Sequence, residues 1–325
     1  MNWNSLLAAA TGVVLAGCVT CQDRPDPVVG NWGLKLDYDT MSAGHLIVSR
    51  DADGAAQALL LWRWASPEKM NNVKLFGNRI VFDSPNGFRF NGFVMGDRMS
   101  AVAIGKNGLA QTTVEGWRNP ENPKCPCAST KNIKLGAGID LLKDGLAGWE
   151  SMNPKAKFGW SIKEENGERV LSNFLGLKPD GKWAGGGANL KTKRADFYDF
   201  NLEYDVRVPK KSNSGVYLRG RYEIQVVDSY GAPVNCHNMG AYYGRVTPTV
   251  AAEKPAGEWQ HVSVTLFRRH LTVVLNGQTI IDDVEVNGVT GGAIDANEFV
   301  PGPLYLQGDH SDADYKNMIL RPAVN

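Results

Sequence analysis

The sequence predicts an all-β protein whose C-terminal half is a jelly-roll β-sandwich, preceded by a smaller antiparallel domain. Three observations favour this fold class: short segments alternate apolar and polar residues, Gly- and Asn-rich turns separate them, and no stretch shows a helical period. The regular alternation of strands and helices that parallel sheets require is also missing from the sequence. The chain has 325 residues, a length that suits two domains.

Residues 30–117 are expected to form the first domain, an antiparallel β-meander that closes into a small barrel-like or curled sheet. Its first segment, Gly30–Leu36, alternates polar and apolar residues as a half-buried strand does. Residues 118–132 carry three prolines, which have no N–H to donate to a strand ladder, so they are predicted to be a linker. Further strands of this domain are predicted over 45–49, 58–64, 73–76, 79–83, 89–95, 98–104 and 111–117.

Residues 133–325 are expected to form the jelly-roll domain. Phe200–Val208 places apolar residues on one face and polar residues on the other, which is typical of a strand that covers a core. Asn276-Gly277 predicts a tight hairpin turn. Together with Phe200–Val208, the further predicted strands fit a two-sheet sandwich. They are predicted over 215–219, 221–227, 259–267, 270–275, 278–282, 304–308 and 317–320.

The first residues predict export. Leu6–Leu15 is an apolar run too short to span a membrane, and it ends in Leu-Ala-Gly-Cys, which resembles a bacterial lipobox. Residues 1–18 are therefore interpreted as a lipoprotein signal peptide, Cys18 as the lipidated residue, and residues 19–29 as a tether. The expected location is the bacterial envelope, periplasmic or on the outer membrane, with membrane contact only through the lipid. A plain apolar tail is the alternative.

Four cysteines remain if Cys18 carries lipid, and an oxidising compartment favours disulfides between them. Cys125 and Cys127 stand too close in sequence for an unstrained mutual bridge. One of this pair is predicted to join Cys21 or Cys236. The net charge of +1 and the absence of a basic stripe exclude nucleic acid as an expected partner.

A polar set is predicted on one face of two neighbouring strands. In Asn213–Arg219, Val216 and Leu218 can face the core, which leaves Tyr217 and Arg219 on the opposite face. In the next strand the same alternation leaves Glu223 and Gln225 opposite the core. An Arg, a Glu and a Gln would then meet, as in a concave sugar-binding face that needs donors and acceptors at fixed positions. An exposed face with an ordinary ion pair is the alternative.

Two other stretches carry candidate site residues. His310 stands just past the strand end that contains Tyr305 and Gln307, and its ordinary pKa suits proton transfer, although a lone histidine is more often structural. The Gly-rich aromatic stretch 236–245, which includes Tyr242, fits a cleft wall or simple packing. Calcium could be bound by the carboxylate oxygens of Asp309, Asp312 and Asp314, but a polar turn explains these three residues better.

Residues 133–322 resemble the bacterial 3-keto-disaccharide hydrolase family, whose members are concanavalin-like or laminin-G-like sandwiches. The likeness is carried by stretches spread along the domain: Leu-Lys-Asp-Gly-Leu-Ala-Gly-Trp at 142–149, Asp-Phe-Asn-Leu at 199–202, Asn-Ser-Gly-Val-Tyr-Leu-Arg at 213–219, Tyr-Glu-Ile-Gln-Val-Val-Asp at 222–228, Gly-Ala-Tyr-Tyr at 240–243, Gly-Glu-Trp-Gln at 257–260, Leu-Asn-Gly at 275–277 and Leu-Gln-Gly-Asp-His at 306–310. Residues 30–117 lie outside the resemblance, and no activity is inferred for them.

The resemblance implies cleavage of glycosides that carry a ketone at sugar C3, by hydrolysis or by elimination followed by hydration. Such a site needs a base for the acidified C2 proton, a donor for the leaving oxygen and a group that stabilises the enediolate. His310 and Glu223 are the expected acid–base pair. Arg219, with a possible divalent metal as cofactor, would stabilise the enediolate oxygen. The residues expected to orient sugar hydroxyls are Gln225, Gln307, Tyr242 and Asp228.

Two alternatives to an enzyme stay open on the sequence. The same scaffold hosts lectins, so a non-catalytic carbohydrate-binding envelope lipoprotein is the second interpretation. A structural or adhesive envelope protein is the third, and it predicts no sugar binding. The strand with paired carboxylates found in laminarinase-type glycosidases is missing, which argues against a conventional two-carboxylate mechanism.

Overall fold

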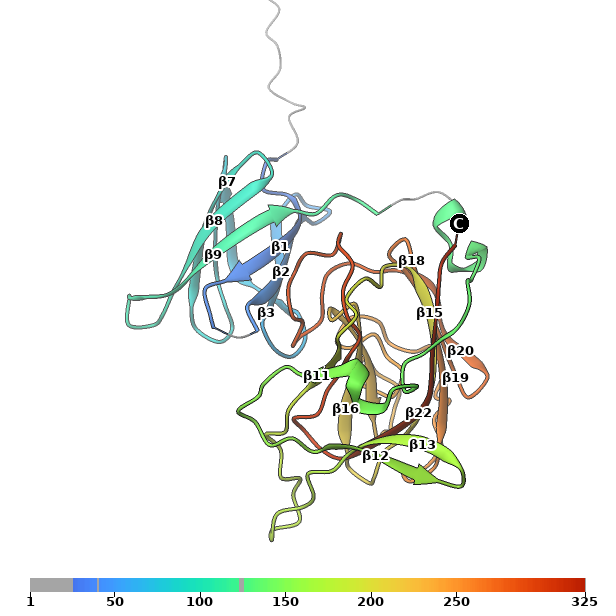
Figure 1. Ribbon diagram of the computed structural model, residues 1–325. Coiled ribbons are helices and arrows are strands. Elements are labelled where there is room, and N and C mark those ends of the chain that lie inside the picture. The colour runs from blue at the N-terminus through green and yellow to red at the C-terminus, as the bar shows by residue number, and fades with distance from the viewer. Residues whose placement is uncertain (1–25, 40, 123–125, 325) are drawn as a thin grey trace, which may run out of the picture.

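The computed structural model describes residues 26–39, 41–122 and 126–324, and its architecture confirms the all-β prediction (Figure 1). Within these ranges the helices are short 3-10 turns: η1 (Pro126–Ala128), η2 (Thr130–Asn132) and η3 (Gly145–Gly148). No helix in the described part of the chain is long and apolar enough to cross a membrane. The lipobox, Cys18 and most of the expected tether lie outside the described residues.

The first domain is one curled antiparallel sheet of nine strands in the order β4-β3-β2-β1-β9-β8-β7-β6-β5 (Figure 1). Its two edge strands, β4 and β5, are joined by the single residue Met70, so the sheet nearly closes on itself around a core that includes Trp32, Phe82 and Phe90. The strands are β1 (Gly30–Leu36), β2 (Ala43–Arg50), β3 (Ala56–Trp62), β4 (Glu68–Lys69), β5 (Asn71–Phe76), β6 (Arg79–Asp83), β7 (Arg89–Met95), β8 (Arg98–Ile104) and β9 (Ala110–Arg118).

The second domain is a sandwich of two antiparallel sheets. One sheet has the order β12-β13-β22-β15-β18-β19-β20, with β10 paired to β22, and the other has the order β11-β14-β21-β16-β17. The strands are β10 (Ile139–Asp140), β11 (Trp149–Ser151), β12 (Trp160–Glu165), β13 (Glu168–Asn173), β14 (Leu190–Thr192), β15 (Phe200–Arg207), β16 (Asn213–Leu218), β17 (Tyr222–Val227), β18 (Gln260–Phe267), β19 (His270–Leu275), β20 (Gln278–Glu285), β21 (Tyr305–Leu306) and β22 (Ala313–Pro322).

Local sequence explains the best-predicted strands. In β15, Phe200, Leu202 and Tyr204 are buried on the core face, as the period of two requires. Between β19 and β20, Asn276 and Gly277 both have positive φ (50° and 82°), the conformation of the favoured hairpin turn, and Leu275 pairs with Gln278.

In the proline-rich segment, the described residues 119–122 and 126–132 form no strand, and residues 126–132 are docked on the second domain. The Thr130 N–H donates to Asp283 Oδ1 at 2.7 Å, and the Thr130 hydroxyl lies 2.7 Å from that of Thr272. Cys127 forms a disulfide, whereas Cys236 is a free thiol, so the predicted pairing with Cys236 is not formed. Cys21 and Cys125 lie outside the described residues.

A buried polar cluster joins the two domains around Glu298, whose side chain is fully buried. Its Oε1 accepts from Asn119 Nδ2 at 2.8 Å and lies 3.6 Å from Arg269 Nη2, and its Oε2 accepts from the Gly288 N–H at 3.1 Å. His45 of β2 lies 3.9 Å from this carboxylate. Burial, together with Arg245 and Arg269, holds the pKa of His45 well below its ordinary value. Glu298 therefore accepts from the segment that follows β9 and from the second domain, with His45 of the first domain beside it.

Replacement of Glu298 by Ala is expected to destabilise the protein by about 3–5 kcal/mol, because it leaves the buried Arg269 without its counter-charge and Asn119 Nδ2 without its acceptor. Urea unfolding followed by tryptophan fluorescence measures the change. Glu115→Ala, at an exposed position on β9, is the control and should change stability by less than about 0.5 kcal/mol. Equal stability of the two variants would show that the cluster does not hold the domains together.

Candidate active site

A pocket of about 110 Å³ lies where the first domain meets the smaller sheet of the sandwich. It is called the Glu223 pocket below. The first domain contributes the segment before β2 and the segment after β3 to its walls. The second domain contributes β16, β17 and β21 and the loops that follow β17, β20 and β21. The lining residues are Met41, Trp64, Ala65, Asn213, Tyr217, Glu223, Tyr243, Gly291, Gly292, Tyr305, Gln307, Asp309 and His310.

Strand register brings the predicted polar residues onto one face. Tyr217 of β16 pairs with Glu223 of β17, and on its other side it pairs with Tyr305 of β21. The rings of Tyr217 and Tyr305 stack with centroids 4.0 Å apart and planes 13° apart. Because the two tyrosines brace each other, they form a rigid wall beside the Glu223 carboxyl group.

Glu223 is buried in a setting that favours its protonated form. Burial raises the pKa of Glu223 to about 8, with a smaller contribution of the same sign from Asp309, while the hydrogen bond to Tyr217 acts in the opposite direction. The Tyr217 hydroxyl lies 2.7 Å from Glu223 Oε2 and 2.8 Å from the Gly291 carbonyl oxygen. One hydroxyl proton cannot serve both acceptors, and a protonated Glu223 resolves this by donating its own. Glu223 therefore holds a transferable proton at neutral pH.

His310 is paired with its neighbour Asp309 at the mouth of the pocket. The distance between His310 Nδ1 and Asp309 Oδ1 is 2.5 Å, and this hydrogen bond raises the pKa of His310 against the opposing effect of burial. About half of the His310 side chain stays exposed. Since Asp309 engages Nδ1, the other ring nitrogen, Nε2, is the one that can take up a proton from a bound molecule. The site thus combines a carboxylic acid and an oriented imidazole.

Two amide oxygens in the pocket walls are buried without a hydrogen-bond partner among the described residues. They are Asn213 Oδ1, at the start of β16, and Gln307 Oε1, just after β21. Buried acceptors are normally satisfied, so these two oxygens are free to accept hydrogen bonds from a molecule bound in the pocket. Sugar hydroxyl groups are donors of this kind, and the predicted role of Gln307 fits this position.

Arg219 does not join the predicted set. Strand β16 ends at Leu218, and Arg219 has a positive φ of 52°, so the alternation that would place it beside Glu223 is broken. Its guanidinium group is buried between the rings of Tyr198 and Tyr222, and it donates to the Tyr222 hydroxyl at 2.7 Å. Arg219 is thus a packing residue at the end of the sheet, outside the Glu223 pocket.

Three further predicted site residues also lie outside the pocket lining. Tyr242 is buried and donates to the Gly288 carbonyl oxygen, while its neighbour Tyr243 lines the pocket. Gln225 lies on the Glu223 face of β17, but it is buried with Oε1 accepting from the Val226 N–H. Asp228 accepts from the Lys211 N–H at 2.8 Å, which stabilises a surface turn. Their polar groups are used within the protein itself.

The described residues do not form a metal site. No three His, Cys, Asp or Glu side chains come together in the described ranges, whereas a bound cation needs such a group. Of the three aspartates considered for calcium, Asp309 pairs with His310, Asp312 accepts from the Leu175 N–H at 2.6 Å and Asp314 pairs with Arg207 at 2.7 Å. Each carboxylate has a structural partner of its own, and Asp314 lies in β22 rather than in the turn before it.

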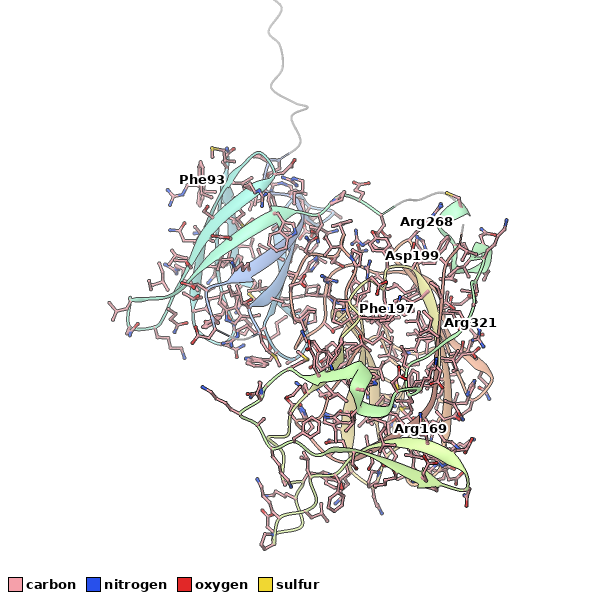
Figure 2. The ribbon with its side chains drawn as sticks, viewed as in Figure 1. Phe93, Arg169, Phe197, Asp199, Arg268 and Arg321 are labelled. Carbon is pink, nitrogen blue, oxygen red and sulfur yellow. The ribbon has the colours of Figure 1, made fainter. Side chains whose placement is uncertain are left out.

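A second, larger pocket on the sandwich has a different character. It has a volume of about 390 Å³ and includes Phe197, Asp199 and Arg268, which Figure 2 labels together on this domain. Burial raises the pKa of Asp199, but its Oδ1 already accepts from the Arg268 N–H at 2.9 Å. The second carboxylate of this pocket, Asp196, is paired with Arg194 at 2.8 Å, and the described lining contains no histidine, so the Glu223 pocket is the better candidate.

Gly215 leaves room for the Glu223 carboxyl group, since a Cβ atom there would lie 2.4 Å from Glu223 Oε1. Gly215→Ala is therefore expected to displace the carboxyl group and to lower turnover of the substrate proposed below by at least about tenfold. Steady-state kinetics measures the loss. Gly148→Ala, which meets no atom closer than 3.9 Å, is the control. Unchanged kcat in the Gly215 variant would contradict this account of the site.

Comparison with known proteins assigns the sandwich. Residues 139–321, more than half of the chain, match the family described as 3-keto-alpha-glucoside-1,2-lyase-like domain. Among solved structures, a proposed glycosyl hydrolase from Parabacteroides distasonis ATCC 8503 is 22% identical, covering 63% of this chain and 94% of its own, with a TM-score of 0.43. The carbohydrate-binding module CBM66 from Bacillus subtilis is 12% identical, covering 53% and 93%, with a TM-score of 0.32. No curated protein matches the chain by sequence.

Proposed function

Because the chain belongs to the family of 3-keto-alpha-glucoside-1,2-lyase-like domains, we propose that it cleaves glycosides that carry a ketone at C3 of the sugar. Family membership supports a carbohydrate-active protein, and the ketone specificity is the finer part of the proposal. The observation that carries it is the pairing, in one pocket, of a carboxyl group whose pKa is raised to about 8 with an imidazole oriented by Asp309.

The proposed reaction begins with removal of the C2 proton, which the C3 ketone acidifies. His310 Nε2 takes this proton, and the electron pair of the C2–H bond moves toward the C3 carbonyl to form an enediolate. The C1=C2 double bond then forms as the C1–O bond to the aglycone breaks. Glu223 donates its proton to the departing oxygen, so the aglycone leaves as a neutral alcohol.

Hydration would complete the cleavage. The oxygen of water adds to C1 of the enone, and protonation at C2 restores the ketone, so the sum of both steps is hydrolysis to 3-keto-glucose and an alcohol. The imidazolium formed by His310 can return the C2 proton, and the Glu223 carboxylate can accept a proton from the water. Each group ends in the state in which it began, so no co-reactant besides water is needed.

The test is mass spectrometry of purified protein, without residues 1–18, incubated with a 3-keto-glucoside beside its unoxidised parent. Release of 3-keto-glucose or the enone from the oxidised substrate alone is the expected result. If both substrates stay intact across several aglycones while sugar binding is detected, the protein is a carbohydrate-binding module. Cleavage of the unoxidised parent at an equal rate would show an ordinary glycosidase and overturn the role of the ketone.

We also propose that the chain is exported and lipid-anchored through Cys18 in the bacterial envelope. The disulfide at Cys127 supports an oxidising compartment. Growth with an alkyne-tagged fatty acid should label the wild-type protein in its native host and leave Cys18→Ser unlabelled. Labelling that survives the substitution would rule out Cys18 as the lipidated residue.

A further inference from the structure

A larger pocket of about 520 Å³ adjoins the Glu223 pocket. The two share Met41, Trp64, Gly292 and Asp309 in their walls, so they lie side by side at the Trp64 side chain. The larger one is called the Trp64 pocket below. A molecule held at Glu223 and His310 can therefore extend past Trp64 into a second space.

The walls of the Trp64 pocket are mainly apolar. Besides Met41 and Trp64 they include Met152, Ala156 and Ile294. About half of Trp64 is exposed (52%), so part of its indole ring is accessible to a ligand. An exposed indole beside two methionines is a surface for a flat apolar group.

The polar residues of the Trp64 pocket are already engaged within the protein. Asn189 donates from Nδ2 to the Tyr305 hydroxyl at 3.3 Å and accepts from the Gly308 N–H at 2.8 Å. The Asn153 Oδ1 accepts from the Lys155 N–H at 3.1 Å. By contrast, the Glu223 pocket contains the unpaired oxygens of Asn213 and Gln307. Hydroxyl groups are thus recognised in the Glu223 pocket and apolar surface in the Trp64 pocket.

The segment that carries Trp64 is held in place although the side chain is exposed. The Gly292 N–H donates to the Arg63 carbonyl oxygen at 2.7 Å, and the Ser66 hydroxyl lies 2.7 Å from His237 Nε2. The Arg63 guanidinium group lies over the rings of Tyr38 and Trp64, at 3.8 and 4.8 Å from their centroids. These contacts tie the segment to both domains, so the indole is positioned before any ligand binds.

We propose that the Trp64 pocket is the aglycone subsite of the enzyme and accepts an aromatic aglycone, with Trp64 of the first domain as its stacking wall. This inference rests on the proposed function, because it assigns the sugar ring to the Glu223 pocket. It gives the first domain a role in substrate selection, although that domain lies outside the family match. Trp64 is a specificity residue here, since it contacts the leaving group and takes no part in proton transfer.

The experiment compares wild-type protein with Trp64→Ala on two substrates, phenyl 3-keto-glucoside and methyl 3-keto-glucoside. Loss of the stacking wall is expected to raise KM for the phenyl substrate about tenfold and to change KM for the methyl substrate less than twofold, with kcat little altered. Trp64→Phe should recover most of the affinity for the phenyl substrate. Phe76→Ala is the matched control, because Phe76 is an exposed aromatic residue (61%) on β5 of the same domain.

An equal effect of Trp64→Ala on both substrates, or no effect on either, would overturn the inference. If the wild-type protein cleaves neither substrate, the proposed function fails, and the subsite is tested separately by calorimetric titration with unoxidised phenyl glucoside. Binding that is lost in Trp64→Ala and kept in Phe76→Ala would still support an aromatic subsite. Binding retained in both variants, or absent from the wild-type protein, would refute it.

Discussion

Replacement of Glu223 by Gln is expected to lower kcat for a 3-keto-glucoside by ~100-fold or more, because the amide cannot donate a proton to the leaving oxygen. The side chain keeps its size, so the contact with Tyr217 and the packing on Gly215 can persist. Glu203→Gln is the matched control, since Glu203 pairs with Arg321 at 2.7 Å on the other sheet. Near-normal turnover in the Glu223 variant would remove this residue from the mechanism.

The same substitution should change how stability depends on pH. The pKa of Glu223 is raised from 4.5 to about 8, so the native state binds more protons than the unfolded state between these values. Stability of the wild-type protein is therefore lost as pH rises through this window, by at most about 1.4 kcal/mol per pH unit from this group. Thermal unfolding should show Glu223→Gln gaining on wild type from pH 5 to pH 8. A constant difference would show that Glu223 is not buried as a neutral acid.

Replacement of His310 by Ala is expected to lower kcat by ~100-fold or more, because it removes the imidazole proposed as the base for the C2 proton. Asp309→Asn should have a smaller effect in the same direction, since it removes the negative charge that strengthens the hydrogen bond to the ring and raises the pKa of His310. The chain offers a matched control in His261, which pairs with Asp205 at 2.8 Å on the other sheet. Full activity of His310→Ala would exclude the imidazole as the base.

These two roles predict a bell-shaped dependence of kcat/KM on pH in the wild-type protein. Activity should rise as the imidazole of His310 loses its proton, at a pH above its ordinary pKa of 6.5. It should fall again near pH 8 as Glu223 ionises. Asp309→Asn should move the acid limb to lower pH, and it should move the alkaline limb in the same direction by a smaller amount, because Asp309 also contributes to the raised pKa of Glu223. A rate that keeps rising beyond pH 9 would contradict the role of Glu223 as the acid.

Much of the fold follows from local sequence. The period of two in Phe200–Arg207 decides which side chains of β15 are buried, because successive residues of a strand point to opposite faces. Asn276-Gly277 specifies the hairpin turn between β19 and β20, because both residues tolerate the positive φ of the turn. The pairing of Tyr217 with Glu223 follows from the same alternation on two short, adjacent strands.

Alternation was a poor guide wherever a strand ended. The expected strand through Arg219 stops one residue earlier, and the left-handed backbone there turns the guanidinium group toward Tyr222. The neighbouring residues Tyr242 and Tyr243 show the same difficulty. The sequence analysis predicted Tyr242 as the site residue, whereas the structure places Tyr243 in the pocket lining. Both cases lie at turns, where one changed φ angle reverses the face of every following side chain.

The sequence by itself determined the all-β class, the strand face that carries Glu223 and the place of His310 just past a strand end, because these depend on residues close together in the chain. Only the tertiary structure decided that Asn213 and Gln307 keep unpaired oxygens and that Trp64 of the first domain reaches the site. The raised pKa of Glu223 is likewise decided by the tertiary structure, because burial causes it. Burial and contacts between domains depend on how distant segments pack, and no local pattern in the sequence encodes them.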